Sequence, residues 1–163
     1  MNKPVKTNVM RLLDRAKIPY DPHEYDVADG RLDGEAVADK IGRPREGVYK
    51  TLVTRGKEIH VFVIPVESHL DLKKAAAVSG EKKLEMLPQK ELKAMTGYVH
   101  GGCSPVGMKK AYSTFFDRHA QERETICVSA GQVGVQVEVE PNRLAQWLEA
   151  PFADLITEEP QAK

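Results

Sequence analysis

The chain contains little cysteine, and its histidines are scattered. Two cysteines, Cys103 and Cys127, occur together with five histidines. No CxxC pair is present and no two histidines are spaced i, i+4, so the sequence offers no zinc-binding motif and we expect no metal site. Two cysteines could form one disulfide, but a cytosolic setting favours two free thiols.

Long apolar runs are also missing. No stretch approaches the roughly 18 consecutive apolar residues that a membrane-spanning helix requires. The N-terminus, residues 1–6, lacks the apolar core of a signal peptide. We therefore expect a cytoplasmic protein that makes no contact with membranes.

The chain has no net charge, because 24 lysines and arginines balance 24 aspartates and glutamates. Any contact with nucleic acid must therefore come from a local basic patch, and its affinity should be modest and sensitive to salt. Hydrophobic residues make up 41% of the chain and charged residues 29%, which is typical of a globular protein. A length of 163 residues suits a single domain.

Periodicity and turn residues predict a mixture of helices and strands. We expect helices, two of them capped by Asp33 and Asp71, over residues 8–17, 34–41, 72–78, 88–94 and 142–149. We expect strands over residues 23–26, 48–54, 59–66, 84–86, 112–117, 125–129 and 132–140. Strands outnumber helices and come in runs, so the pattern is not a regular βαβ repeat. Residues 157–163 are expected to form a frayed polar tail.

Residues 96–110 contain four glycines, one proline and two lysines. Glycine admits positive φ and lacks a Cβ, so successive N–H groups of such a loop can converge on an anion or a developing oxyanion. Lys109 and Lys110 follow the glycines, where partners of a phosphate would lie. Taken alone, the segment is more simply interpreted as a glycine-rich turn that joins two strands.

Lys50 interrupts the apolar strand predicted over residues 48–54. Its side chain must either point to solvent on the outer face of a sheet or project into a pocket. Alternation along the strand does not separate these two possibilities. A buried lysine is uncommon, so a solvent-exposed position is the simpler interpretation of this residue alone.

Several segments together resemble one family. They are Val48-Tyr49-Lys50-Thr51-Leu52-Val53, the glycine loop, Leu70-Asp71-Leu72-Lys73-Lys74-Ala75-Ala76, Lys82-Lys83-Leu84-Glu85-Met86 and Thr125-Ile126-Cys127-Val128-Ser129. Their order and spacing, from about Asn8 to Ile156, are similar to those of the YbaK/EbsC family. Its members are free-standing aminoacyl-tRNA deacylases related to the editing domain inserted in bacterial prolyl-tRNA synthetases. The sequence looks most like the YbaK branch, which hydrolyses Cys-tRNA(Pro).

The resemblance implies an α+β fold with one compact editing domain over residues 1–156 and the polar tail after it. The family's mixed sheet is curved and barrel-like, with helices around it. The resemblance also assigns roles to residues. The catalytic ones would be Lys50, Gly101 and Gly102. Those that bind substrate would be Tyr25, Tyr49, Thr51, Ser104 and Ser129, and those that contact tRNA would be Lys73, Lys74, Lys109 and Lys110.

The implied reaction needs no nucleophile from the protein and no cofactor. No Ser-His-Asp arrangement is apparent in the sequence. In the YbaK branch, the thiol of the cysteinyl substrate attacks its own acyl carbon and releases tRNA and a cyclic thiolactone. Expected partners are aminoacyl-tRNA(Pro) and prolyl-tRNA synthetase. Two alternatives are a deacylase for another amino acid, such as alanine, and a non-catalytic module that binds RNA or a protein partner. Retention of Lys50 and the Gly101-Gly102 pair argues against the second.

Two positions depart from the family pattern. Cys103 stands in the glycine loop where relatives commonly have an apolar residue, and we interpret it as a small buried hydrophobe rather than a nucleophile. The hairpin Gly131-Gln132-Val133-Gly134 lacks the two basic residues often found there in relatives. Contact with tRNA would therefore depend more on the lysines elsewhere in the chain, at positions 73, 74, 82, 83, 109 and 110.

Overall fold

The strands form three sheets in the computed structural model, which describes residues 5–158. The five-stranded sheet has the order β5-β2-β3-β6-β9, the three-stranded sheet the order β1-β8-β7, and β10 pairs with β4. An isolated parallel bridge between Val48 and Cys127 joins the two larger sheets. The strands are β1 (Tyr20–Glu24), β2 (Tyr49–Arg55), β3 (Ile59–Pro65), β4 (His69–Leu70), β5 (Glu85–Met86), β6 (Ser113–Asp117), β7 (Ile126–Gln132), β8 (Val135–Val139), β9 (Phe152–Ala153) and β10 (Ile156–Thr157).

The helices begin and end where local sequence signals place them. They are α1 (Asn8–Arg15), α2 (Gly34–Ile41), α3 (Leu72–Ser79), α4 (Gln89–Thr96) and α5 (Pro141–Trp147), with 3-10 turns η1 (Arg45–Gly47) and η2 (Arg118–Glu122). The side chains of Asp33 and Asp71 accept hydrogen bonds from the first turns of α2 and α3, which confirms both predicted caps. Gly42 ends α2 in the left-handed conformation, at φ 71°.

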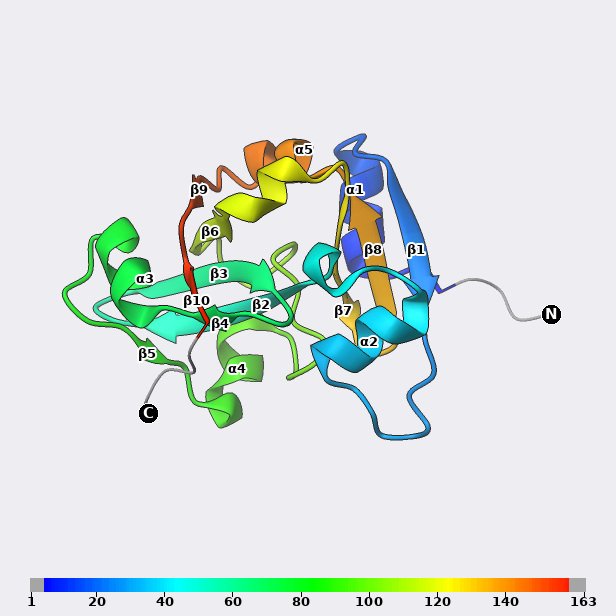
Figure 1. The fold of residues 1–163 in the computed structure, drawn as a ribbon, viewed down its shortest axis with the longest axis horizontal. Helices are drawn as coiled ribbons and strands as arrows, with labels where there is room; N and C mark the ends of the chain where they lie inside the picture. Colours follow the sequence, from blue (N-terminus) through cyan, green and yellow to red (C-terminus); the bar gives the residue numbers. More distant parts are fainter. Residues whose placement is uncertain (1–4, 159–163) are drawn as a thin grey trace.

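The three-stranded sheet is packed between two helices, α1 and α2 (Figure 1). The valines of β8 face α1, where they share a core with Val9, Met10 and Leu13. The opposite face carries Cys127, which packs against Ala38 of α2. Both faces of this sheet are therefore covered, and polar residues of β8 that alternate with its valines are not automatically exposed.

The five-stranded sheet is covered on one face by α3, at the other end of the molecule from α2 (Figure 1). There Phe62 and Ile64 of β3 pack against Ala75 of α3. On the other face, Val53 and Val61 pack against α4 and the glycine loop. The glycine loop is thus part of the packed structure of the domain.

The mixed α+β architecture agrees with the prediction, with three corrections. Residues 132–140 are not one strand, because Val133 and Gly134 form the turn between β7 and β8. β1 starts before His23, at Tyr20, and includes Pro22, which is tolerated because β1 pairs with β8 alone. The predicted tail is ordered at its start, since Thr157 pairs with His69; residues 159–163 lie outside the described part.

The strands of residues 5–158 remain in open sheets and do not close into a barrel. Within the same residues, none of the helices has the length and apolar character needed to span a membrane. The meeting of the two larger sheets at the Val48–Cys127 bridge is the feature that positions the candidate site, because a pocket opens beside it.

Candidate active site

A small pocket lies where β2 meets the three-stranded sheet. Its walls come from the start of β2, from β7 and β8, from the glycine loop, and from the segment that leads into α2. The lining residues are Tyr25, Leu32, Asp33, Gly34, Val37, Val48, Tyr49, Lys50, Thr51, Val66, His100, Gly101, Cys103, Ser129 and Gln136. The cavity volume of about 150 Å³ is below the ~300–1,000 Å³ of pockets that enclose drug-sized ligands. It therefore suits a small group, such as one end of a larger substrate.

Lys50 projects into this pocket and is half-buried. Among residues 5–158, its ammonium group makes no hydrogen bond and no ion pair. Burial lowers the pKa of Lys50, and the Glu35 carboxylate partly opposes that shift. Glu35 itself is bound to Arg45, 2.8 Å away. A cation without a partner in a pocket is a binding group for a negatively polarised atom of a ligand.

The two glycines of the predicted pair have different environments. Gly101 is exposed, lines the pocket and has φ 85°, and its N–H makes no hydrogen bond within the described chain. Gly102 is buried and its N–H donates to the Val99 carbonyl at 3.0 Å. A Cβ on Gly102 would lie 3.1 Å from the Val133 backbone nitrogen. The free amide at the site is therefore that of Gly101, while Gly102 allows the loop to approach the β7–β8 hairpin.

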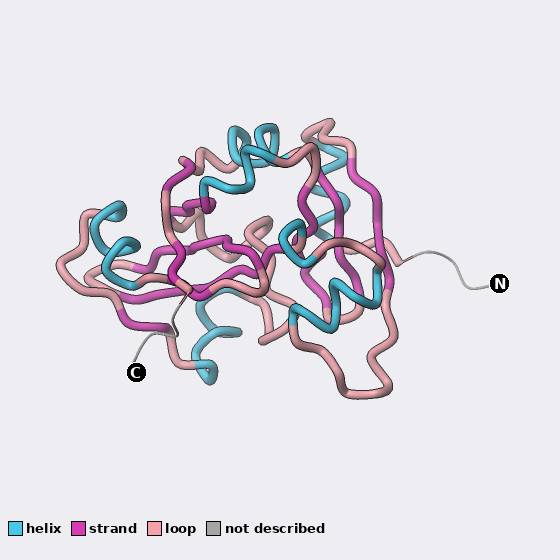
Figure 2. The backbone as a smooth tube through the Cα atoms, viewed as in Figure 1, coloured by secondary structure: helices cyan, strands magenta, loops and turns pink. Residues whose placement is uncertain are grey.

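One wall of the pocket is a long loop between β1 and α2 (Figure 2). The Lys40 ammonium group holds this loop by donating to the carbonyls of Asp26 and Arg31 and to the Asp29 carboxylate, at 2.7–2.8 Å. Tyr25 and Asp33, at the two ends of the loop, line the pocket. The Asp33 carboxylate caps α2, so its acceptor capacity is already in use for structure.

Three more polar side chains line the pocket, that of Tyr25, which directly follows β1, and those of Ser129 in β7 and Gln136 in β8. Ser129 Oγ accepts a hydrogen bond from the Gly131 N–H at 3.1 Å, at the irregularity in β7. Gln136 is 6% exposed, and its Oε1 is buried without a hydrogen-bond partner in the described part of the protein. Burial of an unpaired amide oxygen is costly, which indicates that a ligand or solvent satisfies it.

Sequence reasoning missed Gln136. The residue alternates with valines and was expected on the polar side of a strand, but α2 and the loop before it cover that side. His100 was missed as well; it is exposed and contributes to the pocket lining from the glycine loop.

The other three predicted substrate-binding residues, Tyr49, Thr51 and Ser104, differ in their placement. Tyr49 lies in the main core, and burial raises the pKa of its phenol, whose hydroxyl has no hydrogen-bond partner among residues 5–158. Thr51 lines the pocket and its Oγ1 is likewise buried and unpaired in that range. Ser104 is fully buried, does not line the pocket, and accepts a hydrogen bond from the Val106 N–H. Tyr49 and Thr51 thus both line the pocket and carry an unpaired side-chain oxygen in that range, and Ser104 is the one that lies away from the pocket.

Cys103 lines the pocket but belongs to the core beneath the glycine loop. It is 8% exposed, and burial raises the pKa of its thiol to about 12. At neutral pH the thiol is therefore protonated, which is unfavourable for a nucleophile. Its placement agrees with the interpretation of Cys103 as a small buried hydrophobe.

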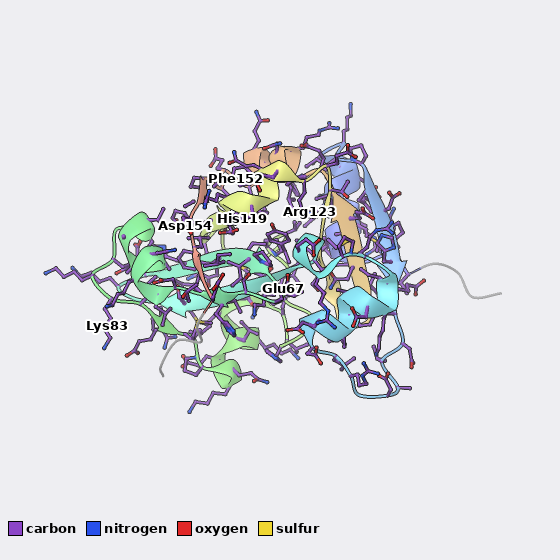
Figure 3. The ribbon with its side chains drawn as sticks, viewed as in Figure 1. Glu67, Lys83, His119, Arg123, Phe152 and Asp154 are labelled. Atoms are coloured by element: carbon purple, nitrogen blue, oxygen red, sulfur yellow. The ribbon has the colours of Figure 1, made fainter. Side chains whose placement is uncertain are left out.

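The predicted tRNA-contacting lysines do not gather at the pocket. Lys73 and Lys74 belong to α3, and Lys74 is bound to Asp154 at 3.0 Å. Lys83 extends from the same end of the molecule, away from α2 (Figure 3). Lys109 is closer: it is exposed and lines a surface groove that also includes Arg11 and Gln132.

Lys110 is exposed as well, next to Lys109, but it lines a different groove. The Lys109 groove reaches the β7–β8 hairpin through Gln132, and the backbone of that residue lies beside Gly102. Lys109 is therefore the predicted contact that lies nearest to the glycine loop in structure as well as in sequence.

The pocket provides a cation and a free amide and has little to offer as a protein nucleophile. Lys50 and the Gly101 N–H can stabilise negative charge on a carbonyl oxygen. The thiol of Cys103 is protonated, and the Ser129 hydroxyl has no hydrogen bond to a histidine in the described chain. Such a site suits a reaction in which the substrate or water supplies the nucleophile.

Comparison with known proteins gives one consistent result. Residues 31–147 match the model of the aminoacyl-tRNA editing domain family. A protein of Enterococcus faecalis, named as a proposed Cys-tRNA(Pro)/Cys-tRNA(Cys) deacylase EbsC, is 44% identical over 156 residues, which cover 94% of this chain and 95% of the relative.

Solved structures share the fold. A proposed trans-editing enzyme for prolyl-tRNA synthetase has a TM-score of 0.80 at 20% identity, over 94% of this chain and 99% of the other. A hypothetical protein has a TM-score of 0.84 at 19% identity, over 91% of this chain and 99% of the other. At these identities the likeness is one of architecture.

Proposed function

The chain belongs to the aminoacyl-tRNA editing domain family, and we propose that it is a trans-editing deacylase that removes cysteine from mischarged Cys-tRNA(Pro). The observation that carries this proposal is the unpaired Lys50 ammonium in a small pocket that also contains the unpaired Gly101 N–H. Both groups can receive the carbonyl oxygen of an aminoacyl ester. The name of the 44% identical relative supports the choice of substrate.

The proposed reaction uses the thiol of the substrate. Its sulfur attacks the acyl carbon, the C–O bond to the ribose breaks, the thiol proton passes to the departing ribose oxygen, and a cyclic thiolactone is released. A thiol of pKa about 8.5 is a few per cent thiolate at neutral pH, so it needs no protein base. Holding it against the carbonyl can contribute about 7–11 kcal/mol through effective concentration. Lys50 and Gly101 then need only to orient the ester and stabilise the oxyanion.

The experiment is a deacylation assay with Cys-tRNA(Pro), Ala-tRNA(Pro) and Pro-tRNA(Pro). We expect turnover of the cysteinyl substrate and little of the other two, since neither alanine nor proline carries a thiol. Preferential turnover of Ala-tRNA(Pro) would instead favour an alanine deacylase. Turnover of none, beside an active relative, would favour a binding module.

Recognition of the tRNA body is assigned to a partner. The chain has a formal net charge of zero, and Lys73 and Lys74 lie at the far end of the molecule from α2 (Figure 1). A neutral protein with few basic residues near its pocket gains little from nonspecific attraction to phosphates. We therefore propose that prolyl-tRNA synthetase presents the tRNA. Added synthetase should lower KM for Cys-tRNA(Pro) and leave hydrolysis of a minimal cysteinyl ester unchanged.

Replacing Cys103 by serine should leave most of the activity toward Cys-tRNA(Pro). The reason is that burial keeps the thiol protonated, so it contributes volume to the core rather than a nucleophile. The check is kcat for Cys103→Ser and Cys127→Ser beside their melting temperatures. A folded Cys103→Ser protein without turnover would assign the nucleophile to the protein.

Reversing Lys109 and Lys110 to glutamate should reduce turnover of full tRNA but spare a minimal cysteinyl ester, which lacks the acceptor-end phosphates. If both lysines contact phosphates, the slope of log affinity against log salt should fall by about 2. Lys73→Glu/Lys74→Glu is the matched control at the other end of the molecule. Equal losses on both substrates would mean that the two lysines support the glycine loop instead.

A further inference from the structure

We infer that His23, Cys127 and Glu138 form a Zn²⁺ site on the face of the three-stranded sheet that packs against α2. The three side chains come from the adjacent strands β1, β7 and β8. Their donor atoms, an imidazole nitrogen, a thiol sulfur and a carboxylate oxygen, all lie within 4.8 Å of one another. No sequence motif predicts this set, because His23 lies more than 100 residues before Cys127 and Glu138, and the three side chains meet only through strand pairing.

The donor set matches zinc chemically. Thiolate, imidazole and carboxylate are the three ligand types that Zn²⁺ takes in proteins, and three protein ligands with a water in the fourth position are a common arrangement. Zn–ligand bonds of about 2.0–2.3 Å place neighbouring donors about 3.5 Å apart in a tetrahedron. The most separated pair would therefore need to close by about 1 Å. A thiolate and a carboxylate also supply two negative charges against the charge of the ion.

The position of the cluster favours a site that is ordered before the ion arrives. Glu138 stands opposite Cys127 in the β7–β8 ladder, and the His23 Nε2 atom lies 2.8 Å from Glu138 Oε1. The Thr125 hydroxyl donates to the other carboxylate oxygen, as expected of a group that orients a metal ligand. Cys127 is buried, while His23 and Glu138 side chains are 18% and 12% exposed, so an ion can enter from the side of these two residues.

Arg43 is the present counter-ion of Glu138, with its Nε atom 2.9 Å from Oε1. A zinc ion would take that oxygen and displace the guanidinium. This is feasible, because Arg43 lies just beyond Gly42, which ends α2, and its side chain is 41% exposed, free to turn to solvent. On binding, the Cys127 thiol releases its proton to solvent and a sulfur–zinc bond forms.

The Zn²⁺ site would affect the candidate active site through the strands that carry residues of both. Each ligand lies two residues from a residue that lines the pocket: His23 from Tyr25, Cys127 from Ser129, and Glu138 from Gln136. An ion here would tie together the three strands that carry these pocket residues. The inference concerns the protein fold and does not depend on the proposed reaction.

The test is a titration of the untagged, chelator-treated protein with Zn²⁺, and with Co²⁺ as a spectroscopic probe. We expect one ion per chain at micromolar metal, a thiolate-to-cobalt absorption band in the near ultraviolet, and a melting temperature that rises with Zn²⁺. Cys127→Ser should lose the band and the shift, and Cys103→Ser, the matched buried thiol, should keep both. His23→Gln, on a partly exposed side chain, repeats the test if Cys127→Ser does not fold.

The Arg43→Gln variant should bind Zn²⁺ more tightly than the wild type, whereas Cys127→Ser should bind it less tightly. Arg43→Gln removes the competing cation and should tighten Zn²⁺ binding by about tenfold or more, since a hydrogen bond to a charged group has that order of effect. A structural ion-pair network without metal would predict no uptake in any variant. The inference is overturned by the absence of uptake at micromolar Zn²⁺ in the wild type, or by a cobalt band that survives in Cys127→Ser.

Discussion

Lys50→Ala is expected to lower the rate of Cys-tRNA(Pro) deacylation by at least about 100-fold, the order of loss seen when one group that stabilises an oxyanion is removed. The lysine projects into the pocket and has no partner in residues 5–158, so nothing in the described protein compensates for its charge. Lys57→Ala is the matched control, an exposed lysine in the turn after the same strand. The measurement is single-turnover deacylation with both variants.

The stability of a Lys50 variant should change in the opposite direction to its activity. Burial lowers the pKa of Lys50 below its ordinary value, which means that the folded state disfavours the charged form relative to the unfolded chain. Lys50→Met removes this penalty on the charged form and should therefore keep or raise the melting temperature while activity is lost. A Lys50→Ala or Lys50→Met protein that is folded and fully active would remove the residue from the mechanism.

Gly101→Ala has the second largest expected effect, a loss of about 10²–10³ in kcat. A residue with a Cβ at φ 85° costs about 1–2 kcal/mol in backbone strain, and relief of that strain would turn the free amide away from the pocket. The added Cβ itself meets only ordinary contact, with Val133 Cγ2 at 3.6 Å. The loss should therefore appear mainly as catalysis and less as stability.

Gly97→Ala separates strain from catalysis. Gly97 has φ 89°, its added Cβ would also meet ordinary contact, with Lys109 Cγ at 3.5 Å, and it does not line the pocket. We expect a similar drop in melting temperature with most of the activity retained. If Gly97→Ala and Gly101→Ala lose activity equally, the loop matters through its conformation and the Gly101 amide has no special role.

Features fixed by neighbouring residues could be predicted from the sequence. Asp33 and Asp71 cap helices because a carboxylate next to a first turn can reach the free amides, and Gly42 ends a helix because it tolerates positive φ. The strand around Lys50 was also correct. Alternation left the direction of the Lys50 side chain open, because it does not reveal whether a face is covered by another element. Only the resemblance assigned Lys50 to the site.

Features fixed by distant contacts could not be predicted. Val133 continues the alternation of β8, so periodicity extended the strand over the turn at Val133 and Gly134, where only the resemblance placed a hairpin. The resemblance treated Gly101 and Gly102 alike, yet only the folded loop reveals that Gly102 donates its amide to Val99. The unpaired Gln136 oxygen likewise becomes visible only when α2 closes over the sheet.

The most direct test of the account is single-turnover deacylation of Cys-tRNA(Pro) beside the same tRNA carrying S-methylcysteine. The methyl group removes the nucleophile and leaves the ester, the ribose and the tRNA unchanged. The account predicts rapid release from Cys-tRNA(Pro) and a rate at least about 100-fold lower for the S-methyl substrate, given the size of effective-concentration effects. Equal rates would contradict it, because the pocket would then be activating water or a protein group.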